Sequence, residues 1–318
     1  MITYALALLM FLTGSSSDAG LRDAIGLYEK GKFSEAADLF RKISDSTPAN
    51  PEPRIWLGRS YLKTREWDKA VQEMEKAVQL QPSNARYHLW LGRACGDRAS
   101  HAGFMKAFGW ARRVVKEFET ARKLAPDDLD VRFDLLEYYL EAPGIVGGGR
   151  EKAEAELQAI TKLNAEKGHA ARATLYSKDK KWDLARKELQ QAVLSYPQSA
   201  SACKDLAAFL LDRNDYESAL GHAKKALQLD NKSKRARLLA AAAEIRLKSD
   251  LDEAFASLQT LAAGSLGDGD PAFEEVYYWL GECFLAKGDR AKAREAYQSA
   301  LAYNPEYAKA KNGLSKLK

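Results

Sequence analysis

The segment LGRSYLKTREWDKAVQEMEKAVQLQP, residues 57–82, decides the fold of this chain. It opens with a Leu-Gly pair, places Tyr61 and Trp67 a few residues later, and then repeats small and large apolar residues at intervals of three or four up to Pro82. Such intervals place apolar side chains on one face of a helix. Because proline cannot continue a helix, the second helical stretch must end just before Pro82. The segment therefore predicts a helix, a short turn and a second helix.

The same pattern recurs along the chain with a period of 34 residues. Its last copy reads Leu280, Gly281, Phe284, Gly288, Ala293, Tyr297, Ala300 and Pro305. Complete and partial copies together predict eight helix–turn–helix units and a capping helix over residues 308–318. One unit cannot bury its apolar face alone, whereas a stack of units buries a continuous core. We therefore expect an all-α solenoid.

Small and large positions of the pattern have different expected places. Gly58 and Ala70 are expected where the two helices of a unit cross, because their missing bulk lets the backbones approach. Tyr61, Trp67 and Met74 are expected to fill the space between units.

The composition agrees with a helical protein. Of the 318 residues, 46% are hydrophobic and 29% charged, and only 9 prolines and 21 glycines interrupt the helical pattern. The 49 basic and 44 acidic residues leave a net charge of +5, which is mild for this length. We therefore expect no nucleic-acid partner.

With these residues and this period, the sequence over residues 20–318 resembles the tetratricopeptide-repeat (TPR) family. The resemblance implies a right-handed superhelix, or right-handed α-solenoid, whose first helices line a concave groove, with second helices outside. It also implies a scaffold or adaptor that binds a protein or an extended peptide. Residues 142–149, APGIVGGG, are similar to an insertion in a bacterial subgroup of that family.

Two insertions interrupt the repeat in the third and fourth units, near residues 97–110 and 142–149, and a longer loop is expected over 262–274. The first insertion carries Phe104, Phe108, Trp110 and Arg112. It is interpreted either as a docking element for an acidic partner or a membrane surface, or as two lengthened helices whose aromatic rings pack on the next unit.

The second insertion, GIVGGGR, has the glycines of an anion-binding loop but lacks the Lys-Ser/Thr ending of a phosphate loop. The alternative is a wide turn between two helices. Because the two insertions fall on consecutive units, we expect them to touch.

The family's repeat frame implies which side chains face the groove. They are Arg59, Arg86 and Arg93 in units two and three, Asp130, Asp134 and Glu137 in unit four, and Glu275, Tyr278 and Glu282 in unit eight. This predicts a basic section beside an acidic one, which suits an extended peptide bearing both signs of charge. The alternative is ordinary solvated helix faces.

Catalytic and metal-binding constellations are missing from the pattern. The cysteines (Cys95, Cys203, Cys283) and histidines (His88, His101, His169, His222) are scattered and match no metal or nucleophile motif. We therefore expect no enzyme, cofactor or metal, and interpret the cysteines as small buried apolar residues. An unrecognised active site is the minor alternative.

The N-terminus differs from the rest. Residues 2–12, ITYALALLMFL, are apolar, and small residues follow up to Ala19. This predicts a signal peptide or a short hydrophobic anchor over residues 1–19. We expect export to a bacterial periplasm or envelope, with a cytoplasmic location as the alternative. A membrane contact is expected only through this segment.

The resulting functional hypothesis is a non-catalytic scaffold that holds its partner in the groove around units three and four. The alternative is a structural subunit of an envelope-assembly or secretion complex.

Overall fold

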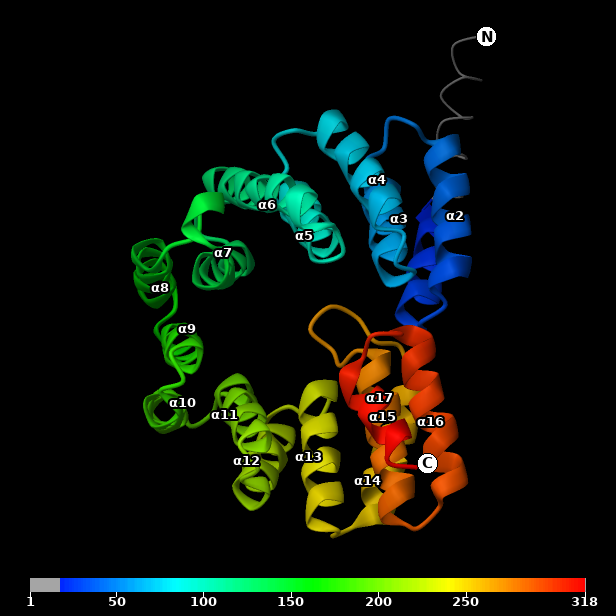
Figure 1. Cartoon of the computed structure of the whole chain (residues 1–318), viewed down its shortest axis with the longest axis vertical. Helices are drawn as coiled ribbons and strands as arrows, with labels where there is room; N and C mark the ends of the chain where they lie inside the picture. Colours follow the sequence, from blue (N-terminus) through cyan, green and yellow to red (C-terminus); the bar gives the residue numbers. More distant parts are fainter. Residues whose placement is uncertain (1–17, 318) are drawn as a thin grey trace, which may run out of the picture. The chain divides into compact units, whose positions relative to one another are not determined.

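The computed structural model describes residues 18–317, and the regular elements in that range are helices (Figure 1). After a helix over residues 18–29 come α2 (Phe33–Ser46), α3 (Glu52–Lys63), α4 (Trp67–Leu80), α5 (Ala85–Ser100), α6 (Phe104–Leu124), α7 (Leu129–Glu141), the 3₁₀ turn η1 (Gly144–Val146), α8 (Arg150–Leu163), α9 (Ala165–Lys178), α10 (Trp182–Ser195), α11 (Ala200–Asp212), α12 (Tyr216–Leu229), α13 (Lys234–Leu247), α14 (Leu251–Ala263), α15 (Phe273–Ala286), α16 (Arg290–Tyr303) and α17 (Ala308–Ser315).

Consecutive helices pair into helix–turn–helix units. The helix over residues 18–29 with α2 forms the first unit, α15 with α16 the eighth, and α17 follows as a cap. The predicted solenoid of such units with a capping helix is confirmed over the described residues. The chain divides into two compact parts within α8, an N-terminal part ending at Ala159 and a C-terminal part beginning at Ile160. Residues 1–17, which hold most of the predicted signal or anchor, lie outside the described range.

The glycine of the Leu-Gly pair lies where the two helices of a unit cross. A Cβ atom on Gly58 would come within 2.8 Å of Met74 and 3.1 Å of the Ala70 carbonyl oxygen. The equivalent atom on Gly281 would come within 2.5 Å of the Tyr297 ring. The repeat places a glycine at these crossings because no side chain fits there, as predicted.

A residue with left-handed backbone conformation (positive φ) lies in the turn between the first and the second helix of a unit. The residues with positive φ at this place are Gly31, Arg65, Lys180, Asn214, Lys248 and Gly288. The backbone N–H of the following residue reaches five positions back, as from Glu66 to the Tyr61 carbonyl at 2.8 Å. This bond closes the helix end in a Schellman-type turn. Second helices stop as expected: α4 ends at Leu80, two residues before Pro82.

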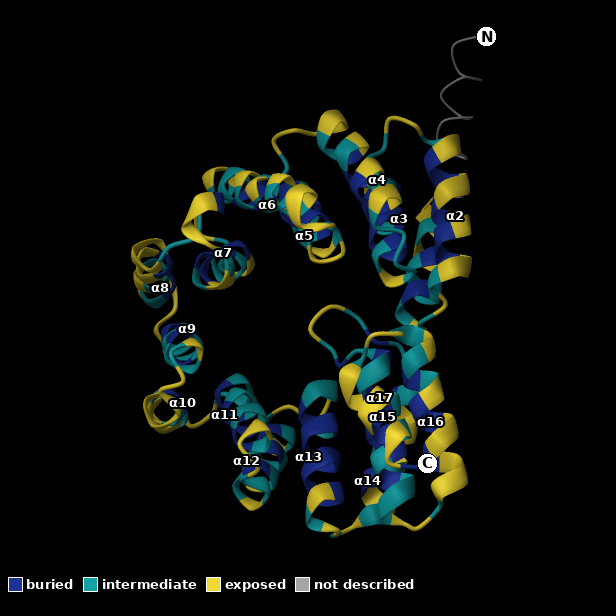
Figure 2. Ribbon diagram, viewed as in Figure 1, coloured by how far each residue is buried: buried dark blue, intermediate teal, exposed yellow. Residues whose placement is uncertain are grey.

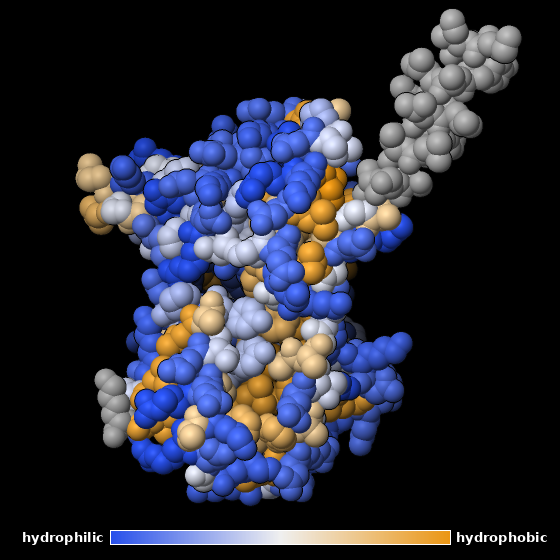
Figure 3. Space-filling model, turned by 90° about the vertical axis from the view of Figure 1, so that its right-hand side faces the viewer, coloured by the Kyte–Doolittle hydropathy of each residue, from blue (hydrophilic) through white to orange (hydrophobic). Residues whose placement is uncertain are grey.

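Buried side chains lie between helices, and exposed ones cover the outside of each unit (Figure 2). Helix α13 is the most buried, with Leu238–Ala243 in the core. Its run of alanines lets neighbouring helices pack closely. On the face drawn in Figure 3, hydrophilic side chains (blue) cover most of the surface, and apolar side chains (orange) are visible in smaller areas among them. Within residues 18–317, no helix combines the length and apolar character needed to cross a bilayer.

Candidate protein-interaction surfaces

The charges predicted for the groove of units three and four pair with one another. The Arg93 guanidinium donates to Asp134 at 2.6 Å from Nε and 3.2 Å from Nη2. Arg86 lies 3.6 Å from Asp130, and both of these side chains are exposed. Glu137 is exposed on the same helix as Asp134. The basic section on α5 is thus matched by the acidic section on α7, so much of the predicted difference in sign is neutralised within this surface.

Burial raises the pKa of Asp134 above its ordinary value, and the hydrogen bonds from Arg93 act in the opposite direction. The pair therefore lies in a partly desolvated place. Its geometry, with two guanidinium N–H groups on one carboxylate, is the stronger form of such a contact.

Arg59, the third basic residue predicted for the groove, has a different environment. Its side chain is 4% exposed, and its guanidinium lies 3.9 Å from the Trp56 ring centre, 4.2 Å from that of Trp90 and 5.1 Å from that of Tyr28. These rings belong to the first helices of three consecutive units. Arg59 therefore holds three units together through cation–π contacts.

The insertion in unit three lengthens α5 and α6 into a projecting hairpin, as one interpretation predicted. Its aromatic residues are not all packed: Phe104 is 76% and Met105 83% exposed. Phe108 is half-buried and meets Phe104 edge to face at 4.9 Å. Trp110 is half-buried between Arg98 and Arg113, each 5.8 Å from its ring centre.

The hairpin is fastened to unit two at its turn and along α6. The His101 ring stacks on Trp67 with centres 3.8 Å apart. Arg98 Nε donates to Asp68 at 2.5 Å, and Arg113 pairs with Glu75. The hairpin is therefore anchored on the side that faces unit two, and its turn also carries exposed apolar side chains.

The insertion in unit four is a wide turn. Only Gly147 of its three consecutive glycines has positive φ, at 100°. Gly148 is required for another reason: a Cβ there would lie 1.8 Å from the Ala142 carbonyl oxygen. The N–H groups of Gly147, Gly148 and Gly149 all donate to backbone carbonyls of the same turn or of α7. These amides are engaged within the protein, which favours the turn over the anion-binding loop.

The two insertions touch, as expected from their positions. The Tyr138 hydroxyl lies 2.7 Å from the carbonyl oxygens of both Ala111, on α6, and Val146, in η1. Burial raises the pKa of Tyr138 to about 12, so the phenol stays protonated and can donate there. Val146 is 3% exposed. The Gly-rich turn thus buttresses α6 behind the projecting hairpin.

The C-terminal part has a pocket of about 270 Å³ on its first-helix side. It is lined mainly from α11, α13, α15 and α17, with one residue from the start of α12 and one from the turn before it. The lining residues are Ala208, Leu211, Asp212, Asn214, Tyr216, Arg235, Leu239, Arg246, Glu275, Tyr278, Trp279 and Lys309. Apolar and aromatic surface thus lies beside both signs of charge.

Arg246 occupies the middle of this lining. Its guanidinium donates to Glu282 at 2.6 Å and to the Tyr278 hydroxyl at 2.9 Å, and lies 5.0 Å from the Trp279 ring centre. Arg235 pairs with Glu275. The aromatic rings are therefore held in fixed positions by charged neighbours.

Sequence reasoning did not name most of this pocket, although the signal was present. Both arginines belong to the first helix of unit seven. Arg235 occupies the frame position that Arg86 has in unit three, and Arg246 lies in the last turn of the helix. The same counting, continued through units six and seven, gives Leu211, Asp212, Arg235 and Arg246.

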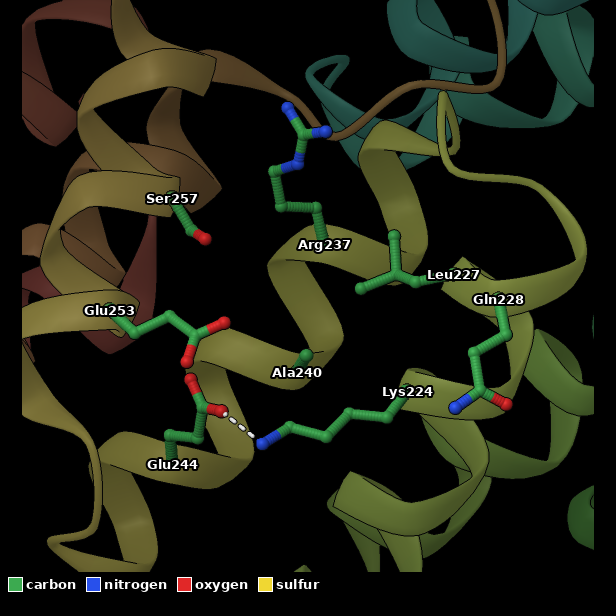
Figure 4. Close-up of a pocket in the computed structure, with 8 residues that line it drawn as sticks. All are labelled: Lys224, Leu227, Gln228, Arg237, Ala240, Glu244, Glu253 and Ser257. Atoms are coloured by element: carbon green, nitrogen blue, oxygen red, sulfur yellow. Dashed lines mark ion pairs between the residues drawn. The ribbon is translucent and has the colours of Figure 1, made fainter.

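A second pocket, of about 340 Å³, lies between α12, α13 and α14 (Figure 4). Glu244 is 1% exposed and lies 3.0 Å from Lys224 Nζ. Figure 4 shows the carboxylate of Glu253 turned towards that of Glu244. Burial, followed by repulsion from Glu253 and Asp250, raises the pKa of Glu244, while Lys224 lowers it.

Among the described residues, Glu244, Asp250 and Glu253 form one group whose oxygens could face a common cation, within 4.8 Å of one another. Lys224 already supplies a positive charge to Glu244. The second pocket therefore holds its carboxylates beside the basic side chains of Lys224 and Arg237.

The cysteines and buried histidine have structural surroundings. Cys95, Cys203 and Cys283 are buried free thiols, as predicted, and burial raises the pKa of Cys95 to about 12. His88 lies between Glu117, at 2.7 Å, and the Pro82 carbonyl, at 2.9 Å. These contacts join α5 to the end of α4 and to α6.

Eight consecutive helix–turn–helix units over the described residues define a helical-repeat protein. Three family models, each described as a tetratricopeptide repeat, match residues 27–93, 170–234 and 274–307. The chain belongs to the tetratricopeptide-repeat family, whose members generally mediate protein–protein interactions. No curated protein sequence matches it.

Solved structures share the fold at low identity. Yeast Tom70 is 17% identical, with a TM-score of 0.59, over 95% of this chain and 63% of the Tom70 chain. This chain thus spans less than two thirds of that neighbour. A thermophilic TPR protein from Thermus thermophilus is 20% identical over 71% of this chain and 98% of its own, with a TM-score of 0.43.

Proposed function

We propose that this protein is a non-catalytic scaffold that holds an extended segment of a partner protein against the first helices of its repeats. The observation that carries the proposal is the pocket on α11, α13, α15 and α17, where Leu211 and Trp279 adjoin Arg246 and Glu275. A pocket of about 270 Å³ accommodates one or two side chains of a peptide, and charges of both signs around it set the peptide's register.

The first-helix surface of units three and four is a second candidate binding surface, in the N-terminal part of the chain. Here the exposed side chains of Arg86, Asp130 and Glu137 lie beside the Arg93–Asp134 pair. Pairing within the surface lowers its net field, so recognition here rests on hydrogen bonding and shape more than on long-range attraction.

The non-catalytic part of the proposal is supported by the state of the reactive groups. The thiols of Cys95, Cys203 and Cys283 are buried, and burial raises the pKa of each. A thiol that stays protonated is a poor nucleophile.

Site-specific photo-crosslinking in cells tests the binding face. A photoreactive amino acid replaces Asp212 or Lys309 at the pocket, and Arg86 or Glu137 on units three and four. Leu194, which is 73% exposed on the second helix α10, is the matched control position. We expect discrete protein adducts from the first-helix positions and none of the same mass from position 194.

Equal adducts from all positions would contradict the proposal. Adducts from the Leu194 position alone would instead favour the structural-subunit hypothesis, in which outer surfaces form the contacts. Export and the envelope location remain part of the proposal, and fractionation of the native protein tests them: an intact Met1 in the cytoplasm would contradict export.

A further inference from the structure

The tip of the α5–α6 hairpin exposes a compact apolar surface. Phe104 and Met105 are 76% and 83% exposed, the two highest values among the large hydrophobic residues of the described chain. They are adjacent in sequence and begin helix α6. Phe108 lies one turn further and supports the Phe104 ring edge to face.

The surroundings of this tip are basic. From Phe104 to Lys116, α6 carries Lys106, Arg112, Arg113 and Lys116 and no acidic residue. Lys106, Arg112 and Lys116 are exposed, while Arg113 pairs with Glu75 of unit two. On α5 the nearest acid is Asp97, one turn before the end of that helix. The exposed end of the hairpin therefore combines apolar side chains with excess positive charge.

The charge in the first turn of α6 does not favour the start of a helix. Gly103 caps α6 without a side-chain hydrogen bond, and the first turn contains Lys106 but no acid. A positive charge near a helix N-terminus opposes the helix dipole, and large exposed apolar groups gain nothing from water. Local rules broken together at one place indicate that something other than stability selected these residues.

We propose that this tip inserts into the surface of an anionic lipid membrane. Two adjacent apolar side chains offer far less area than the roughly 800 Å² per partner of a stable protein interface. They match instead the shallow burial of apolar groups at a membrane interface, which reaches about 5–10 Å below the headgroups. Arg112 lies eight residues beyond Phe104, about 12 Å along the helix, so it reaches the phosphate level when Phe104 is inserted.

Because the hairpin is anchored to unit two, such insertion costs little conformational entropy. The stack of His101 on Trp67 and the bond from Arg98 to Asp68 fix the hairpin before it meets lipid. The contact is additional to the one predicted for the N-terminal segment, and it develops the membrane-surface interpretation of the first insertion. It is also independent of the first-helix binding face.

Vesicle binding by the full chain tests the proposal. Vesicles of phosphatidylcholine, with or without one quarter phosphatidylserine, are mixed with wild type, with Phe104→Ser/Met105→Ser and with Lys106→Glu/Arg112→Glu. We expect either double change to lower partitioning onto the anionic vesicles by about tenfold or more. The matched control, Ile145→Ser/Leu194→Ser, replaces side chains that are 68% and 73% exposed and should bind as wild type.

Residues 1–17 are the same in every variant, so any vesicle binding through them is common to all. A second, position-specific readout therefore reports on the hairpin alone. Met105→Cys or Leu194→Cys is labelled with an environment-sensitive fluorophore, since the native cysteines are buried. The label at position 105 should shift to the blue with anionic vesicles, and the label at 194 should not.

An unshifted label at position 105, or vesicle binding unchanged by Phe104→Ser/Met105→Ser, would overturn the proposal. So would loss of a protein partner in those variants with vesicle binding unaffected, since the tip would then dock on protein.

Discussion

Arg93 on α5 and Asp134 on α7 are joined by two N–H donors of the guanidinium, 2.6 and 3.2 Å from the carboxylate oxygens, across the boundary between units three and four. The two side chains are 30% and 20% exposed. Arg86 and Asp130 make a longer contact between the same two helices, 3.6 Å, with both side chains at least half exposed.

Replacing Arg93 with Ala should therefore lower the free energy of unfolding by about 1–2 kcal/mol, because Asp134 would be left partly buried without its cation. Arg86→Ala should change it by less than about 0.5 kcal/mol. Urea denaturation of both variants checks this. Equal changes in the free energy of unfolding would show that the difference in burial between the two ion pairs does not determine their contributions to stability.

Gly281 marks the closest crossing of α15 and α16. Gly281→Ala should destabilise the protein by about 1–3 kcal/mol, because the added Cβ would lie 2.5 Å from the Tyr297 ring. Gly221, within α12, has open space around it, and Gly221→Ala should stabilise by about 0.5–1 kcal/mol. Thermal unfolding should thus shift in opposite directions, and a common direction would refute the crossing argument.

Arg59 acts through the planar stacking of its guanidinium between Trp56 and Trp90. Arg59→Lys keeps the charge but loses that stacking, and should cost about 1–2 kcal/mol of stability. Arg112→Lys, at an exposed position on α6, is the control and should be nearly neutral. Chemical denaturation with tryptophan fluorescence measures both. A neutral Arg59→Lys would mean that charge alone matters there. Because Arg59 is buried, acidic substitutions at this position report on folding rather than on partner binding.

Glu244 gives a prediction for pH dependence. Burial raises its pKa in the folded protein above the ordinary value, so the folded state binds this proton more tightly than the unfolded state. The sign follows from linkage: this stabilising effect is present below the unfolded pKa and is lost as pH rises through the folded pKa. Glu244→Gln cannot titrate and can still accept a bond from Lys224.

The stability of Glu244→Gln relative to wild type should therefore increase as pH rises from about 4.5 towards neutrality. Denaturation at a series of pH values tests this, with Glu151→Gln, at an exposed position on α8, as the control. A stability difference that stays flat with pH, or that falls as pH rises, would show that Lys224 outweighs burial.

The repeat could be predicted because its causes are local. Gly58 and Gly281 at the crossings, and Pro82 after a second helix, act within one unit and recur with the period, so one copy explains the others. The contact between the two insertions also followed from their order in the chain. The exposure of Phe104 and the burial of Arg59 did not, since both depend on which side chains of other units lie opposite.

The sequence by itself determined the helical period, the number of units and the positions of their turns, because 34-residue spacing and the short-range rules of helices are sufficient for these. Only the tertiary structure decided how the charges are used. Arg93 and Asp134 lie 41 residues apart in the sequence, in the first helices of units three and four, with the insertion of unit three between them. Neighbouring helices then bring opposite charges together, while the same insertion carries Phe104 and Met105 beyond any helix that could cover them.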